Sequence, residues 1–451
     1  MTDASRTPLP DPATSPESKT RTDIGSVFVS NYPPYSFWSE AAVEQALGEL
    51  DSPQPASRSL GLYLHIPFCR KRCKFCYFKV YTGKNSDEIQ TYLDALGAEL
   101  DTWGRMASVQ GRELDFVYFG GGTPSFISVK HLTGLVERAR AALPWRNPRE
   151  VAFECEPGTL TRSKLEAIRA IGVTRLSLGV EHFDDRILET NGRAHVSKEI
   201  HRVRPWIAEL DFPQLNIDLI AGMIGDTWDT WKATVQQAID YDPDSVTIYQ
   251  MELPHNAIYA RDLREGQLDR TYVADWATKR EWNQYAIDAL RAAGFRSSSA
   301  YTMVKDDGRP QNFVYRDALW TGADMIATGV ASFGHMNGVH FQNTGSWKDY
   351  LDQAASGRLP LNRAYVLPDE ERLVREMILQ MKLGHLSRAY FQDKFATDII
   401  ERFGEPFATL RSEGMLDWDG DTVRITPAGM LQVDGLLPAF YHSRYRHSRY
   451  T

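Results

Sequence analysis

The feature that most constrains this 451-residue chain is an alternation of short apolar strands with helical stretches, which runs from residue 60 to about 335. Strand–helix alternation of this kind is typical of a parallel sheet built from βαβ units. The pattern therefore predicts an α/β fold. We expect strands near residues 62–67, 115–119, 150–155, 174–181, 215–221 and 245–252, with a seventh near 323–332.

The expected strands carry polar residues at every second position, and alternate residues of a strand share one face. Parallel strands that are buried on both faces are usually apolar throughout, so a repeated polar face indicates a lumen that holds a polar ligand. We therefore predict a partial, TIM-like (β/α)6 barrel, open on one side, with its site at the C-terminal ends of the strands. The residues of this face are Tyr63, His65, Glu154, Glu156, Arg175, Ser177, Gly179, Glu181, Asn216 and Asp218.

Composition divides the chain into three parts. In residues 1–55 we expect a disordered start, rich in Pro, Ser and Thr, followed by an arm that packs on the main domain. Residues 56–360 hold the barrel. Residues 361–451 predict helices and a hairpin that turns at Asp419–Gly420, a winged-helix-like α+β domain. We expect this domain to act as a lid rather than to bind DNA, because the net charge is −8.

Charge and cysteine content exclude several functional classes. A chain with a pI near 5.8 and no dominant basic footprint is not expected to bind nucleic acid. It has neither a run of about 18 apolar residues, as a membrane span would need, nor an N-terminal apolar signal core. Four cysteines in so long a chain are not a disulfide framework. The sequence thus predicts a cytoplasmic protein with free thiols.

Three of the four cysteines follow the first expected strand in a C-x3-C-x2-C pattern, at Cys69, Cys73 and Cys76. Basic residues separate them, so this loop is not expected to be core. A structural zinc site needs four ligands, and His65 would have to be the fourth. A [4Fe–4S] cluster is normally held by four thiolates, so three would leave one iron open to a ligand with an amine and a carboxylate. We favour the cluster, and we expect Cys155, on an apolar strand face, to be a core residue.

The cysteine spacing, with Phe75 before the last cysteine, resembles the signature of the radical S-adenosylmethionine (SAM) superfamily. The segments YLHIPFC, YFGGGTPSFIS, ECEPGTL, LSLGVEHF and NIDLIAGM resemble its oxygen-independent coproporphyrinogen III oxidase-like family. That family includes the oxidase, a heme chaperone, methyltransferases and cyclopropanases. The resemblance runs from about residue 60 to 440. It implies a [4Fe–4S] cluster on the three cysteines, SAM as a second cofactor, and an electron donor of the flavodoxin or ferredoxin type.

The resemblance also implies individual roles. Tyr63 and Glu154 would be catalytic residues close to the cluster and SAM, and Phe75 would stack beside the adenine. Alternatives stay open: Glu154 could pair with Arg175, and the glycine segment could be a plain turn. Met251 and Phe333 could equally be core residues. The full set of implied SAM contacts is Tyr63, Phe75, Gly121, Gly122, Thr123, Glu154, Glu181, Arg193, Asp218, Met251 and Phe333.

The sequence says less about the substrate than about the cofactors. Phe78 stands where the true oxidase of the family has a fourth cysteine, which weakens the case for decarboxylation of coproporphyrinogen. Tyr301, Tyr315 and Trp320 suit the covering of a flat ligand, but ordinary packing explains them equally well. Three functions stay open. They are a radical SAM enzyme that decarboxylates or methylates a tetrapyrrole-like substrate, a heme-binding chaperone, and a zinc-stabilised barrel without redox chemistry.

Overall fold

Seven parallel strands form the centre of the structure, a computed structural model that describes residues 21–446. The predicted disorder of residues 1–20 lies outside this range. Strand β9 pairs with β1, and the sheet continues in chain order to β6, so the predicted parallel sheet is confirmed. These strands are β1 (Leu60–Ile66), β2 (Leu114–Gly121), β3 (Glu150–Cys155), β4 (Arg175–Glu181), β5 (Gln214–Ala221), β6 (Ser245–Gln250) and β9 (Asp324–Thr328).

Antiparallel strands extend both edges, and the complete order of the twelve strands is β12-β11-β10-β9-β1-β2-β3-β4-β5-β6-β8-β7. The two end strands do not pair with each other, so the barrel is open, as predicted. The sheet extends past residue 360, where the sequence suggested a domain boundary. The edge strands are β7 (Phe295–Ser297), β8 (Thr302–Lys305), β10 (Phe333–Met336), β11 (Val339–Asn343) and β12 (Leu361–Val366).

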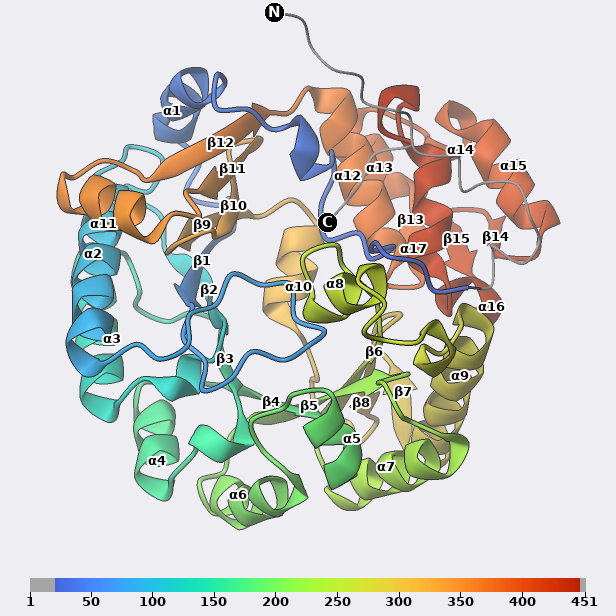
Figure 1. Ribbon diagram of the computed structural model, residues 1–451. Helices are drawn as coiled ribbons and strands as arrows, with labels where there is room; N and C mark the ends of the chain where they lie inside the picture. Colours follow the sequence, from blue (N-terminus) through green and yellow to red (C-terminus); the bar gives the residue numbers. More distant parts are fainter. Residues whose placement is uncertain (1–20, 447–451) are drawn as a thin grey trace, which may run out of the picture.

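Helices surround the sheet as an outer layer (Figure 1). The apolar strand face packs against them, and Leu62, Leu64 and Ile66 of β1 are fully buried. Asn85 caps α2 in a capping box with Glu88, which satisfies backbone N–H groups at its start. The helices of this layer are α1 (Val43–Asp51), α2 (Ser86–Gly104), α3 (Val129–Ala142), α4 (Arg162–Ala170), α5 (Asp185–Thr190), α6 (Ser197–Glu209), α7 (Trp228–Asp240), α9 (Trp276–Ala292) and α11 (Trp347–Ala355). Two further helices, α8 (Ile258–Arg264) and α10 (Val314–Trp320), lie in the middle of the view in Figure 1.

The C-terminal part forms a separate small unit around a three-stranded antiparallel sheet of order β13-β15-β14. The predicted hairpin is present, with Asp419 and Gly420 at its turn, and Thr426 caps α16. The winged-helix-like α+β character is thus confirmed. Its elements are α12 (Asp369–Met381), β13 (His385–Ser387), α13 (Arg388–Phe395), α14 (Ile399–Arg402), α15 (Gly404–Ser412), β14 (Leu416–Asp419), β15 (Thr422–Ile425), α16 (Pro427–Met430) and α17 (Val433–Leu436).

The N-terminal arm, which we define as residues 21–38, runs between the barrel and the C-terminal unit. Tyr32 is fully buried and shares a hydrophobic core with residues of the C-terminal unit. Trp38 stacks on the ring of His340 at a centroid distance of 4.9 Å. Next to the arm, Ser39 pairs with Ala364 of β12. The arm therefore bridges the two units.

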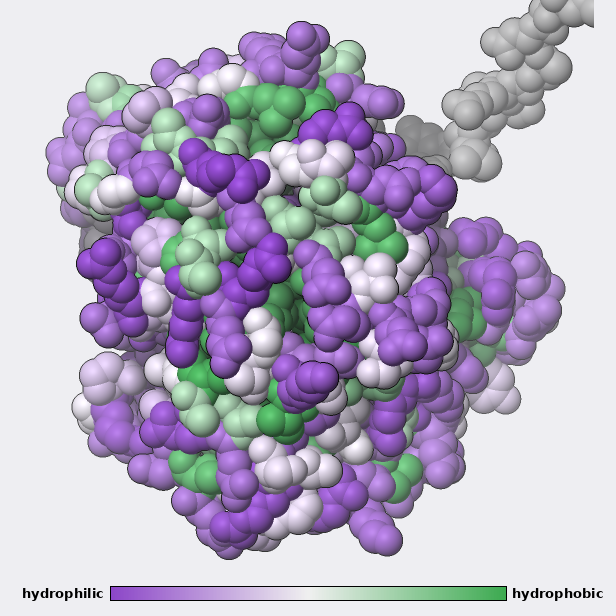
Figure 2. Space-filling view, turned by 90° about the vertical axis from the view of Figure 1, so that its left-hand side faces the viewer, coloured by the Kyte–Doolittle hydropathy of each residue, from purple (hydrophilic) through white to green (hydrophobic). Residues whose placement is uncertain are grey.

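Hydrophilic side chains dominate one face of the molecule (Figure 2). Figure 2 shows a face that is mainly hydrophilic, with apolar side chains in small, separate groups. Among residues 21–446, every helix is too short or too polar to cross a membrane.

Candidate functional site

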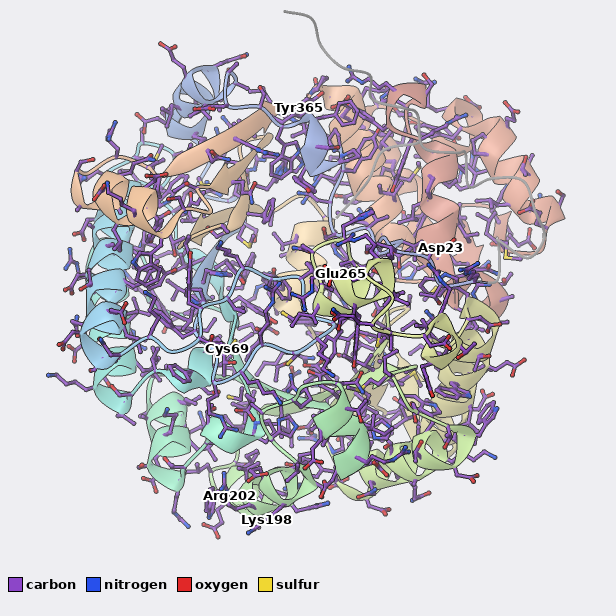
Figure 3. All side chains as sticks on the ribbon, viewed as in Figure 1. Asp23, Cys69, Lys198, Arg202, Glu265 and Tyr365 are labelled. Carbon is purple, nitrogen blue, oxygen red and sulfur yellow. The ribbon has the colours of Figure 1, made fainter. Side chains whose placement is uncertain are left out.

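A cavity of about 880 Å³ lies at the C-terminal ends of β1–β6. Several parts of the chain enclose it, among them the cysteine loop with the strand ends, the start of the arm, α9, and the segment of α16 and α17. Figure 3 shows Cys69 near the middle of the molecule and Asp23 of the arm on the side of the C-terminal helices. The C-terminal unit therefore contributes a wall of the cavity.

The three clustered thiols line this cavity, and all are free. Burial raises the pKa of Cys69 to about 11 and that of Cys76 to about 12, and each is raised further by the neighbouring thiols. Within residues 21–446, no three Cys, His, Asp or Glu side chains are arranged to hold one metal ion. The corners of an iron–sulfur cube point in different directions, so thiolates that bind it need not converge on one point.

Two side chains donate hydrogen bonds to these sulfurs. Thr123 Oγ1 lies 3.4 Å from Sγ of Cys69, and Arg193 Nη1 lies 3.3 Å from Sγ of Cys73. Burial alone would lower the pKa of Arg193, but the net effect of Cys73, Glu181 and Glu156 is to raise it. The hydrogen bond from Thr123 lowers the pKa of Cys69, against the larger raising effect of burial, and so favours the thiolate, the form that binds iron.

The glycine segment at the end of β2 brings backbone close to the cysteine loop. Gly121 has φ of +114°, which L side chains rarely adopt. A Cβ at Gly122 would lie 2.8 Å from the carbonyl carbon of Pro67, and its N–H donates to Ile66 O. The segment is thus more than a plain turn, because only glycine permits this approach.

Glu154 lies inside the polar part of the cavity. It accepts hydrogen bonds from the Tyr118 hydroxyl, at 2.6 Å, and from the Gly121 N–H, at 3.3 Å. Burial raises its pKa to about 7. It does not pair with Arg175, whose guanidinium donates to Gln214 and Ser245. Glu154 is therefore available to a ligand.

Two further carboxylates follow on β4 and β5. Glu181 has φ of +65° at a bulge in the β4–β5 pairing, and it lies 3.5 Å from Arg193 Nη1. Asp218 accepts a hydrogen bond from Asn216, and burial, followed by the nearby Glu181, raises its pKa to about 8. All three carboxylates line the cavity, so the predicted polar lumen is confirmed for these positions.

Aromatic side chains form the rest of the lining. Tyr249 lies deep in the molecule, yet 41% of its surface is accessible because it faces the cavity. Phe78 is 46% exposed and stacks on Tyr77. Tyr301, Tyr315, Phe75 and Met251 also line the cavity.

Three predicted residues lie elsewhere. Tyr63 stacks on Tyr118 behind the lining, with its hydroxyl 3.2 Å from His65 Nδ1. Phe333 packs against Tyr35 and Trp38 of the arm, because β10 turns away from the strand ends. Trp320 packs on the core of the C-terminal unit. Cys155, at 5% exposure, is a core residue, as predicted, although it borders the cavity.

Sequence reasoning missed several lining residues. It also missed Tyr118 of β2, which holds Glu154 in place. The arm and α9 contribute Asp23, Trp276 and Arg280, whose positions depend on long-range packing. No local sequence pattern indicates that these three residues reach the cavity.

The donor set fits the cofactors of a radical SAM protein. Three thiolates on one loop leave one corner of a [4Fe–4S] cube without a protein ligand, and carboxylates and backbone N–H groups stand around the same space. Cys69, Cys73 and Cys76 would hold the cluster. Gly121, Gly122, Glu154, Glu181 and Asp218 would face SAM.

Comparisons with known proteins agree with this chemistry. The model of the radical SAM superfamily matches residues 63–238. The heme chaperone HemW of Bacillus subtilis is 26% identical over 381 residues, covering 84% of this chain and 98% of the relative. The oxygen-independent coproporphyrinogen III oxidase of Pseudomonas aeruginosa is 25% identical over 423 residues, covering 88% of this chain and 90% of the relative.

The fold has a solved counterpart. The structure of coproporphyrinogen III oxidase (HemN) from Escherichia coli, described as a radical SAM enzyme, superposes with a TM-score of 0.81 at 22% identity. The match covers 93% of this chain and 99% of that one. The predicted arrangement of barrel and C-terminal unit is therefore a known one.

Proposed function

We propose that this chain is an enzyme of the radical SAM superfamily, in the group of oxygen-independent coproporphyrinogen III oxidases and HemW-type heme chaperones, and that it acts on a tetrapyrrole-like substrate. The observation that carries this proposal is the shared cavity. The three free thiols, the buried carboxylates and the accessible aromatic rings of Phe78 and Tyr249 all line one space of about 880 Å³. That volume lies within the usual range for small-molecule and cofactor sites.

When bound, a [4Fe–4S] cluster would supply an electron that splits SAM and yields a 5′-deoxyadenosyl radical, which removes hydrogen from the substrate. The protein prepares the space for this chemistry. Thr123 and Arg193 direct hydrogen bonds at Cys69 and Cys73. Glu154 offers hydrogen-bond acceptors, and its position is fixed by Tyr118.

The accessible aromatic rings favour a large, tetrapyrrole-like substrate. Tyr249 stacks near Tyr301 at a centroid distance of 6.4 Å, and both face the cavity. Such rings pack against the apolar faces of the rings of a ligand. We propose decarboxylation or radical methyl transfer on a molecule of the coproporphyrinogen class, in the cytoplasm, with an electron donor of the flavodoxin or ferredoxin type.

A heme chaperone is the second candidate, favoured by the identity to HemW of Bacillus subtilis and by Phe78 at the place of the oxidase's fourth cysteine. One experiment separates the two. Anaerobically reconstituted protein is incubated with SAM, a reductant and coproporphyrinogen III, and all products are identified by mass spectrometry. An enzyme forms 5′-deoxyadenosine together with an altered tetrapyrrole. Stable heme binding and heme transfer without any altered tetrapyrrole would reject the enzyme proposal.

A further inference from the structure

Arg280 of α9 lines the same cavity as the cysteine loop. It belongs to the wall that α9 forms with the start of the arm, next to Trp276. In Figure 1, α9 lies beside α16, on the side of the molecule opposite to α2. A ligand that reaches from the cysteine loop to this wall would have to be large.

The guanidinium of Arg280 has no protein partner within residues 21–446. Its Nε is buried without an acceptor, and neither an ion pair nor a hydrogen bond joins the side chain to another described residue. Burial lowers its pKa, with no nearby carboxylate to offset the effect. Arginine stays charged in proteins, and this side chain is half-buried, so its cation is free to meet a ligand in the cavity.

Four carboxylates of the cavity have partners other than Arg280. Glu181 faces Arg193, and Glu156 pairs with Arg70 and His195. Glu252 accepts hydrogen bonds from the backbone N–H groups of the arm at residues 27 and 28. Asp434 forms an ion pair with Lys382. None of them neutralises Arg280.

We propose that Arg280 binds a carboxylate of the substrate in this cavity. The inference rests on the proposed function and adds a specificity-determining residue to it. An arginine offers a planar pair of donors that matches a carboxylate. A phosphate would carry more negative charge, and Asp23, Glu252 and Asp434 on the same lining disfavour it. Arg280 thus orients a large, carboxylate-bearing ring at the end remote from its reacting group.

The test compares Arg280→Gln with wild type in binding coproporphyrin III, which has four carboxylates, and its tetramethyl ester, in which they are uncharged. Affinities are measured by fluorescence quenching in one buffer. Arg291→Gln is the matched control, because Arg291 lies on the same helix and pairs with Asp288 at the surface. We expect the affinity of Arg280→Gln for coproporphyrin III to fall at least about tenfold, as the loss of a charged hydrogen bond predicts. Its affinity for the ester should not change.

Three results would overturn the proposal: an equal loss for both ligands, no loss for either, or wild-type protein that binds neither. Arg280→Lys should recover part of the affinity, since it keeps the charge but not the paired donors. SAM cleavage without substrate is measured on the same preparations. If wild type cleaves SAM while Arg280→Gln binds coproporphyrin III normally, this inference fails and the radical chemistry stands. If cleavage fails, the proposed function fails whatever the binding result.

Discussion

Arg193 donates a hydrogen bond from Nη1 to Sγ of Cys73 over 3.3 Å, although 120 residues separate them in the chain. The same guanidinium nitrogen lies 3.5 Å from Glu181, and Nη2 donates to Gly179 O. A buried cation is thus fixed beside a thiol that we assign to the cluster. Positive charge and hydrogen bonds to cluster sulfurs ease reduction.

Replacing Arg193 should therefore make the cluster harder to reduce. In Arg193→Gln we expect the midpoint potential to fall by on the order of tens of millivolts, and Arg193→Lys should recover part of the shift. Potentiometric titration monitored by electron paramagnetic resonance measures the change. Arg202→Gln is the control, since Arg202 lies on α6 at the outer surface (Figure 3). An unchanged potential in Arg193→Gln would reject the assignment.

Replacing a cysteine of the loop and replacing the cysteine of the core should have different effects on the cluster. Cys73→Ala should abolish binding of the cluster, whereas Cys155→Ala should leave it nearly intact, because Cys155 belongs to the apolar core. Iron and sulfide analysis of anaerobically reconstituted protein gives the result. Equal loss of iron in the two variants would contradict the three-cysteine site.

Asp218 should make the stability of the cofactor-free protein depend on pH. Burial, followed by Glu181, raises its pKa from 3.8 to about 8, so the folded protein holds a proton that the unfolded chain releases. The contribution of this group to the free energy of unfolding therefore falls as pH rises from about 4 to about 8.

Asp218→Asn removes this dependence. The stability of the variant relative to wild type should increase across that pH range, as measured by urea unfolding at several pH values. Asp240→Asn is a matched control, since Asp240 is an exposed residue at the end of α7. A stability difference that is constant with pH would contradict the raised pKa.

Lys382 joins the C-terminal unit to the arm. It is fully buried, and its Nζ lies 2.7 Å from Asp434 and donates to the carbonyl of Val29. Lys382→Met leaves Asp434 without its partner and should lower the free energy of unfolding by about 3–5 kcal/mol. Lys348→Met removes an exposed pair with Asp352 and should leave the free energy of unfolding nearly unchanged. If chemical denaturation gave similar losses of unfolding free energy for the two variants, the buried pair would contribute no more to stability than the exposed pair.

Much of the barrel could be predicted from local patterns. The six central strands follow from alternation, and the polar lumen follows from period two, because side chains such as Glu154 and Asp218 must share a face. The cysteine loop could be located because three thiols and their basic neighbours stand together in the sequence. These features depend on spacing alone.

What escaped prediction depends on long-range packing. Alternation places Glu181 on the polar face, but it does not predict the bulge with positive φ at this position. The resemblance implies a ligand contact for Phe333, but the antiparallel turn of β10 takes this residue to the arm. Arg280 and Asp23 reach the cavity only because the arm and α9 fold over the strand ends. Their positions follow from tertiary contacts between segments far apart in the sequence.

The central claim is that three thiolates hold an iron–sulfur cube whose fourth iron is open to SAM. The most direct measurement is the yield of 5′-deoxyadenosine and methionine when reconstituted, reduced protein meets SAM under anaerobic conditions. We predict that wild type forms both products in equal amounts and that Cys73→Ala forms neither. Wild-type protein that carries its full complement of iron and sulfide yet leaves SAM intact would contradict the claim.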